Sequence, residues 1–171
     1  MAEMEVLGVK ENTKEFSKNE ERVISFKLNE ELIGIDIKKI VKITKELDIT
    51  PVPKTKEYIL GVINLRGNIV PVVDLKKMLD LPNNEEEETK FILVIDSDLG
   101  NIGLMVDKIV GANTIEPEEI QPTPINAIGI DSKYITGVVM AKDEESGERN
   151  LLILLDIVKL FENDENTQEE V

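Results

Sequence analysis

Three sequence motifs of this chain occur twice, in the same order. Residues 34–41 match 103–110, residues 58–62 match 134–138, and residues 72–79 match 154–161. Tyr58 follows Gly34 by 24 positions, whereas Tyr134 follows Gly103 by 31. The extra residues of the second copy are therefore expected in loops, outside the packed elements. The duplication predicts two homologous units in tandem.

Short stretches of alternating apolar and polar residues fill both copies, which is typical of strands with one buried face. Strands are predicted over 22–28, 32–37, 62–65, 69–73, 91–95, 102–106, 112–115, 134–141 and 151–155. A helical turn is predicted over 38–41 and a turn over 107–110, and short helices are predicted to begin at Asp74 and Asp156. The pattern predicts an all-β fold with short helices, built as β-barrels or sandwiches, and five strands per unit favour two small, partly closed β-barrels.

The repeat also predicts where the units begin and end. We expect a first β-barrel subdomain over 20–83 and a second over 89–162, with terminal strands allowed to cross between them. Residues 1–19 and the acidic segment 163–171 are expected to be flexible, because such charged runs bury little apolar surface.

The chain contains no histidine and no cysteine. These two residue types supply most general bases near neutral pH, most soft-metal ligands and the strongest nucleophile. Phosphate-loop, nucleophile-elbow and dinucleotide motifs are also missing from the sequence. We therefore expect no catalytic residues, no metal and no cofactor. Four repeat-related aspartates, Asp36, Asp74, Asp107 and Asp156, are better explained as caps and strand ends than as paired acids or a cation site.

The net charge of −15 argues against nucleic acid and anionic membranes as partners. The acidic N-terminus lacks the apolar core of a signal peptide, and no apolar run approaches the roughly 20 residues that a membrane span needs. A cytoplasmic protein without membrane insertion is expected.

The stretch 58–75, YILGVINLRGNIVPVVDL, resembles the signature of the CheW family, the coupling proteins of bacterial chemotaxis. Related patterns occur at 34–37, 103–107 and 134–137, so the resemblance covers about Arg22 to Phe161. It implies two SH3-like five-stranded barrels in tandem. It also implies a cytoplasmic adaptor, recruited to membrane-associated receptor arrays, that binds the regulatory domain of the histidine kinase CheA and the cytoplasmic tip of a chemoreceptor.

The resemblance also implies a set of receptor- or kinase-binding residues: Ile40, Lys42, Asn64, Arg66, Gly67, Ile109 and Ala112. Arg66 occupies the position of the family's functional arginine, although arginines at hairpin tips are usually solvated and dispensable. Ile40 and Ile109 are as well explained by the core of each unit. Gly67 is expected to serve a turn, as Gly61 is expected to serve close packing. Lys42 stands where the family often has an acidic residue.

Two other functions remain open at this point. One is a CheV-like protein or a coupling module of another sensory pathway, which would share the same architecture. The other is an enzyme or small-ligand binder that uses a carboxylate-lined cleft between the two units. The sequence favours the chemotaxis adaptor over both.

Overall fold

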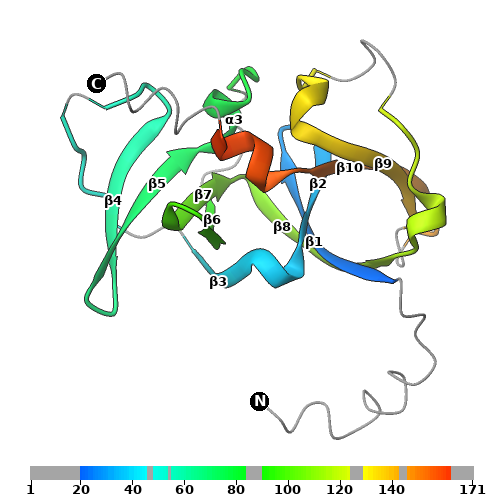
Figure 1. Cartoon of the computed structure of the whole chain (residues 1–171), viewed down its shortest axis with the longest axis horizontal. Coiled ribbons are helices and arrows are strands. Elements are labelled where there is room, and N and C mark those ends of the chain that lie inside the picture. Colours follow the sequence, from blue (N-terminus) through cyan, green and yellow to red (C-terminus); the bar gives the residue numbers. More distant parts are fainter. Residues whose placement is uncertain are drawn as a thin grey trace, which may run out of the picture.

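The computed structural model describes residues 20–45, 48–53, 55–83, 90–123, 129–142 and 146–162 (Figure 1). Strands in these ranges form two five-stranded sheets, and the helices are short. The predicted all-β fold with short helices is confirmed. The segments 1–19 and 163–171, both expected to be flexible, lie outside the described residues.

Sheet A has the strand order β8-β1-β2-β10-β9, and sheet B the order β3-β6-β7-β5-β4. The strands of sheet A are β1 Glu21–Leu28, β2 Glu31–Asp36, β8 Lys108–Ile115, β9 Ile135–Lys142 and β10 Arg149–Leu155. Those of sheet B are β3 Ile40–Lys45, β4 Ile59–Leu65, β5 Asn68–Asp74, β6 Phe91–Ser97 and β7 Gly100–Val106. The short helices are η2 Ile37–Lys39, α3 Leu75–Met78, η3 Pro117–Glu119, η4 Ser132–Tyr134 and a C-terminal helix over 157–162. In the described ranges, no helix has the length and hydropathy to cross a bilayer.

Each sheet combines strands from both copies of the repeat. The β1–β2 hairpin of the first copy lies between β8 and β10 of the second, and the β6–β7 hairpin of the second copy lies between β3 and β5 of the first. The register repeats as well: Gly34 lies opposite Leu154 in the parallel pair of β2 and β10, and Gly103 lies opposite Val72 in that of β7 and β5. The two copies have therefore exchanged their first hairpins.

The predicted limits of 20–83 and 89–162 allowed terminal strands to cross between the subdomains, and each sheet does take strands from both sides of that division. The cause is local. β2 passes into β3 through the three residues of η2, and β7 passes into β8 through Asp107 alone. The single residue Asp107 is too short for even a two-residue reverse turn, and the helical turn of η2 leads the chain from β2 into the other sheet. The turn predicted over 107–110 is accordingly wrong, since β8 begins at Lys108.

Strand β3 was not predicted from the alternation of the sequence, which favoured a helical turn over 38–41. A helical turn is present, one residue earlier, as η2. Helix η2 ends at Lys39 and the strand begins at Ile40. The register shifts between Ile40 and Lys42, so Val41 is an extra, bulged residue on this strand. The bulge interrupts the two-residue period from which the strand could have been predicted.

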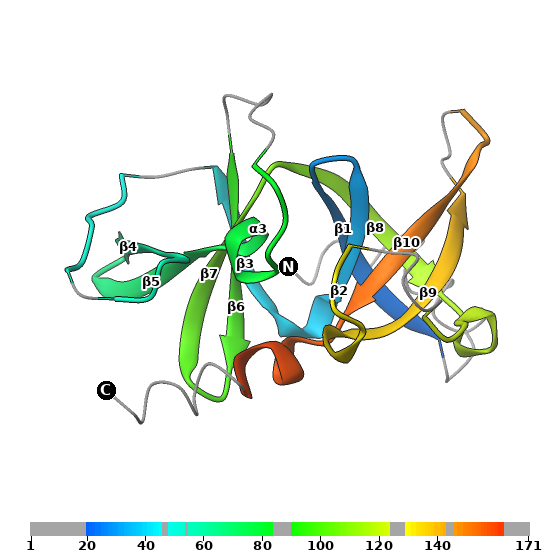
Figure 2. The ribbon, with the colours of Figure 1, turned by 90° about the horizontal axis from the view of Figure 1, so that it is seen from above.

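The apolar core has three parts. Each barrel has a small cluster of its own: Val23, Ile115, Val139, Leu152 and Leu154 in sheet A, and Ile63, Val70, Val72, Ile92 and Val94 in sheet B. A larger central cluster contains residues of both sheets, among them Phe26, Ile33, Leu93 and Leu104. Figure 2 shows the sheets side by side with the C-terminal helix between them. The two barrels therefore share a core as well as exchanging hairpins.

Each barrel is closed by the chain that follows the third strand of one repeat copy, β3 in sheet B and β8 in sheet A. Thr50 bridges to Val62 on β4, and Gln121 bridges to Val138 on β9. A Cβ on Gly61 would overlap the carbonyl of Thr50, and one on Gly137 would lie 2.9 Å from the carbonyl oxygen of Gln121. The duplicated glycine is thus required by the duplicated bridge, and the close-packing role predicted for Gly61 is confirmed.

Candidate functional site

The β4–β5 hairpin presents Arg66 at a tight, exposed tip. Arg66 and Gly67 are its two loop residues, with φ of 53° and 88°. The backbone amide of Gly67 donates a 2.8 Å hydrogen bond to Oδ1 of Asn64. A left-handed conformation at a non-glycine residue costs roughly 1–2 kcal/mol. The turn therefore holds the backbone of Arg66 in a conformation that arginine does not favour. Figure 1 shows this hairpin at the outer side of sheet B, away from sheet A.

Ile40 and Ile109 occupy equivalent places at the two junctions between the sheets. Both side chains are half-buried and pack against the central cluster. Ile40 lies opposite Ile95, and Ile109 lies opposite Phe26. Each isoleucine therefore contributes to the core, as its alternative explanation required, and a contact of either with a partner remains a prediction.

Lys42 and Ala112 complete the predicted set. Lys42 is half-buried on β3 opposite Val94, whereas Ala112 is exposed on β8 opposite Ile24. The seven residues thus form three groups: the Arg66 hairpin and β3 in one barrel, and β8 in the other. Strands β3 and β4 stand at opposite ends of the order of sheet B, and the Thr50–Val62 bridge closes that barrel.

Exposed apolar residues beside these groups were not predicted. Ile69, opposite Asn64 on the Arg66 hairpin, is 64% exposed. Val41 on β3 and Val110 on β8 are 55% and 51% exposed. The sequence does contain a signal for the last two, because both follow the duplicated Lys-Ile pair at 39–40 and 108–109. Ile69 lies on the Arg66 hairpin, and Val41 and Val110 lie next to Ile40 and Ile109, so each of the three groups has an exposed apolar neighbour.

A buried charged group ties sheet A to sheet B. We call it the Asp107 cluster, and its members are Asp107, Lys76, Lys90 and Asn29. Asp107 is 5% exposed and pairs with Lys76 Nζ at 3.1 Å and with Lys90 Nζ at 3.0 Å. The backbone amide of Asn29, in the β1–β2 turn, donates a 2.7 Å hydrogen bond to Asp107 Oδ2. The β1–β2 turn of sheet A is thereby bound to helix α3 and to Lys90, the residue that precedes strand β6 of sheet B.

The Asp107 cluster predicts a specific loss of stability in acid. Burial alone raises the pKa of Asp107, but hydrogen bonds from the Asn29 amide, Lys90 and Lys76, with the charge of Lys76, outweigh it and hold the pKa below the usual value of an aspartate. A carboxyl whose folded pKa lies below its unfolded one stabilises the fold above the unfolded pKa, and loses that effect as pH falls through the folded pKa.

We therefore expect the difference in unfolding free energy between the native chain and an Asp107→Asn variant to be constant above about pH 5 and to shrink below about pH 4. Urea unfolding of both proteins across this range measures it. The comparison between variants cancels the titration of the other carboxylates. A difference that stayed the same down to about pH 2 would show that the carboxylate is not stabilised by its partners.

The other three repeat-related aspartates have the capping role expected of them. The backbone amide of Lys38 donates to Asp36 Oδ1 at 3.0 Å, that of Lys76 to Asp74 Oδ1 at 3.1 Å, and that of Lys159 to Asp156 Oδ1 at 3.2 Å. Among the described residues, no group of three or more acidic side chains has the arrangement of a metal site.

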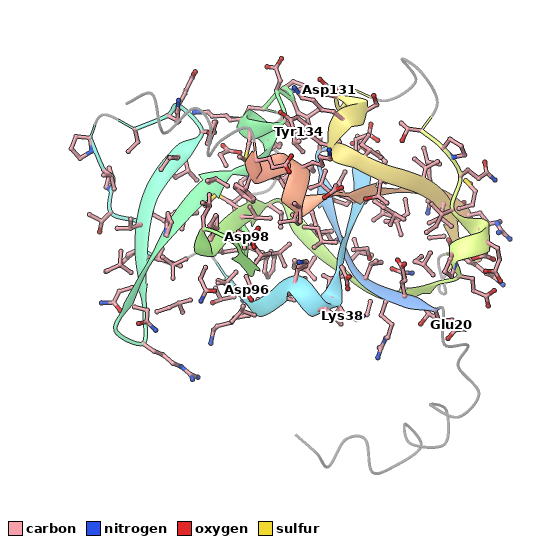
Figure 3. The ribbon with its side chains drawn as sticks, in the orientation of Figure 1. Glu20, Lys38, Asp96, Asp98, Asp131 and Tyr134 are labelled. Carbon is pink, nitrogen blue, oxygen red and sulfur yellow. The ribbon has the colours of Figure 1, made fainter. Side chains whose placement is uncertain are left out.

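A surface cavity of about 190 Å³ lies where the β6–β7 turn meets the C-terminal helix. It is lined by Lys39, Asp96, Ser97, Asp98, Leu99, Ile157, Val158, Phe161 and Glu162. In the view of Figure 3, Asp96 and Asp98 are labelled between this helix and the segment that contains η2 and β3. None of the seven residues predicted to bind partners lines the cavity.

Comparisons with known proteins give a consistent result. The family model described as CheW-like domain matches residues 22–165. The chain is 34% identical to the chemotaxis protein CheW of Thermotoga maritima over 141 residues, which is 82% of this chain and 87% of that protein. It is 32% identical to CheW of Treponema pallidum over 148 residues, 84% of each chain. The crystal structure of scaffolding protein TtCheW from Thermoanaerobacter tengcongensis aligns with a TM-score of 0.72 at 31% identity, covering 82% of this chain and 87% of that one.

Proposed function

The chain belongs to the CheW family of chemotaxis coupling proteins, and we propose that it joins the cytoplasmic tips of chemoreceptors to the regulatory domain of the kinase CheA. The observation that carries this proposal is the family match over 22–165, which spans both sheets and includes the Arg66 hairpin. In this role the protein works in the cytoplasm, at membrane-associated receptor arrays, and catalyses no reaction.

A rigid body that touches two partners suits this function. The exchanged hairpins, the shared central cluster and the Asp107 cluster all connect one sheet to the other. A displacement imposed on one barrel would therefore be passed to the other without being absorbed between them. Coupling of this kind is a difference in binding free energy between signalling states, typically about 1–3 kcal/mol.

The proposed contact surfaces are the three groups of predicted residues and the exposed apolar side chains beside them. Asn64, Arg66 and Gly67 on the hairpin would provide the polar centre of one surface, with Ile69 next to it. The planar guanidinium of Arg66 is suited to carboxylates or backbone carbonyls of a partner.

The junction groups would provide apolar contacts. Ile40 and Ile109 keep part of their surface exposed, and Val41 and Val110 beside them are largely exposed. An apolar stripe on a receptor helix could lie against such residues. Lys42 adds a positive charge here where the family often has an acidic residue, so its complement on the partner is expected to be acidic.

The test is reconstitution of the three-component complex. We expect the labelled chain to sediment with receptor fragments and CheA together, and to make CheA activity depend on the receptor fragments. Amide chemical shifts of the labelled chain, recorded with the isolated CheA regulatory domain, would then map the surface that the kinase contacts. Failure to sediment with both partners would remove the proposed function.

A further inference from the structure

The internal repeat places a short helix against a hairpin turn twice. We call these two contacts the helix–turn junctions. At the first junction, α3 follows β5 and meets the β1–β2 turn. At the second, the C-terminal helix follows β10 and meets the β6–β7 turn. Alignment of Gly34 with Gly103 makes Asn29 the counterpart of Asp98, because each precedes its glycine by five positions. Lys76 and Val158 are likewise counterparts, since each follows its capping aspartate by two.

The first junction is filled by a lysine side chain. Lys76 is 4% exposed, although lysine is rarely buried this deeply unless it is paired. Its Nζ lies 3.1 Å from Asp107 Oδ1 and donates hydrogen bonds of 3.3 Å to Oδ1 of Asn29 and of Asn83. The fold therefore accepts an aliphatic stem ending in an ammonium group between a closing helix and a turn.

The second junction lacks this lysine and is open. Val158, at the position of Lys76, is 48% exposed, and Leu99 in the turn is 39% exposed. The cavity of about 190 Å³ described above lies here. Among the residues that the structure describes, three with carboxylates, Asp96, Asp98 and Glu162, line it with a single cation, Lys39. Its charged groups therefore leave it with a net negative charge.

We propose that this cavity binds a lysine side chain presented by a partner protein. Leu99, Ile157, Val158 and Phe161 offer apolar surface to the stem, and the carboxylates offer acceptors to the ammonium group. The acceptors differ from those of the first junction, because Lys38 stands where that junction has Asp107. Lysine is favoured over arginine because a compact ammonium with three donors suits acceptors from several directions. The site is separate from the residues proposed to contact receptor and kinase, so it adds a contact to the proposed function.

A short peptide tests the site without any natural partner. The probe is a capped Gly-Lys-Gly tripeptide, titrated into the full isotopically labelled chain while amide chemical shifts are recorded. We expect saturable shifts at 96–99 and 157–162 with a dissociation constant in the millimolar range, as suits a ligand of this size. Peptides with norleucine or Nε-acetyl-lysine in place of lysine keep the stem but lack the charge. They should bind at least about tenfold more weakly if the carboxylates contribute as charged partners.

Variants of the chain complete the test. Val158→Lys introduces the residue found at the first junction, and should fill the cavity and abolish the shifts. Asp98→Asn should weaken binding several-fold. Glu30→Gln, which removes an exposed carboxylate from the turn at the filled junction, is the matched control and should leave binding unchanged.

Three results would overturn the inference: no saturable shift with the lysine peptide, equal binding of the norleucine peptide, or unchanged binding to a folded Val158→Lys chain. These readouts involve neither receptor nor CheA. Loss of the lysine site would therefore leave the proposed coupling function intact, and failure of the reconstitution would leave the lysine site intact.

Discussion

Replacing Asp107 with asparagine is expected to lower the free energy of unfolding by about 3–5 kcal/mol, the usual cost of removing one partner from a buried ion pair. The substitution leaves Lys76 charged and buried, with amide oxygens in place of a carboxylate. A small domain has a total stability of roughly 5–15 kcal/mol, so the loss would be a large fraction of it. Urea unfolding followed by circular dichroism at neutral pH measures the change.

Lys76→Met provides the matched comparison. In this variant Asp107 keeps its 3.0 Å pair with Lys90 and its hydrogen bond from the Asn29 amide, so the loss should be smaller. The double variant should be more stable than the sum of the two losses predicts, because removing Asp107 matters less once Lys76 is gone. Equal losses that simply add would show that the two side chains act independently.

The local part of the fold was predictable because its causes are local. Asp74 and Asp156 were expected to cap helices, and each accepts the expected backbone hydrogen bond. The hairpin strands follow the two-residue period of the sequence. The sheet that each first hairpin joins was not predictable, since it depends on whether the chain turns back or continues into the other sheet after β2 and after β7. The course of the chain is set by the three residues of η2 after β2 and by Asp107 after β7. Neither connection has a distinctive sequence signal.

The geometry of the Arg66 hairpin was predictable because a short turn defines it. Asn64, Arg66 and Gly67 are close in sequence, and their hairpin was expected. The Asp107 cluster was missed because its members come from four separate segments. A retrospective signal lies in the repeat itself: the cluster has Lys76 and Asp107 where the other copy has Val158 and Lys38. These two positions, at which the copies differ in charge, thus mark where the two helix–turn junctions differ in structure.

Arg66→Ala is the second substitution with a large expected effect, and here the effect is on binding. We expect the affinity for receptor fragments or for the CheA regulatory domain to fall by about 2 kcal/mol or more, roughly 30-fold, as at a hot-spot arginine. The fold should persist, because the side chain is exposed and the Asn64 hydrogen bond is made to the amide of Gly67. Titration of each labelled partner with the variant, with its melting temperature as a check on folding, gives the result.

Two further variants separate the guanidinium group from charge in general. Arg66→Lys keeps the charge but loses the planar pair of donors, so it should recover only part of the affinity. Arg149→Ala removes another exposed arginine, from the closing hairpin of the other barrel, and should bind as the native chain does. If Arg66→Ala folded normally and bound both partners with unchanged affinity, Arg66 would be a solvated hairpin residue. The contact surface would then have to be sought among Ile40, Ile109 and their exposed neighbours.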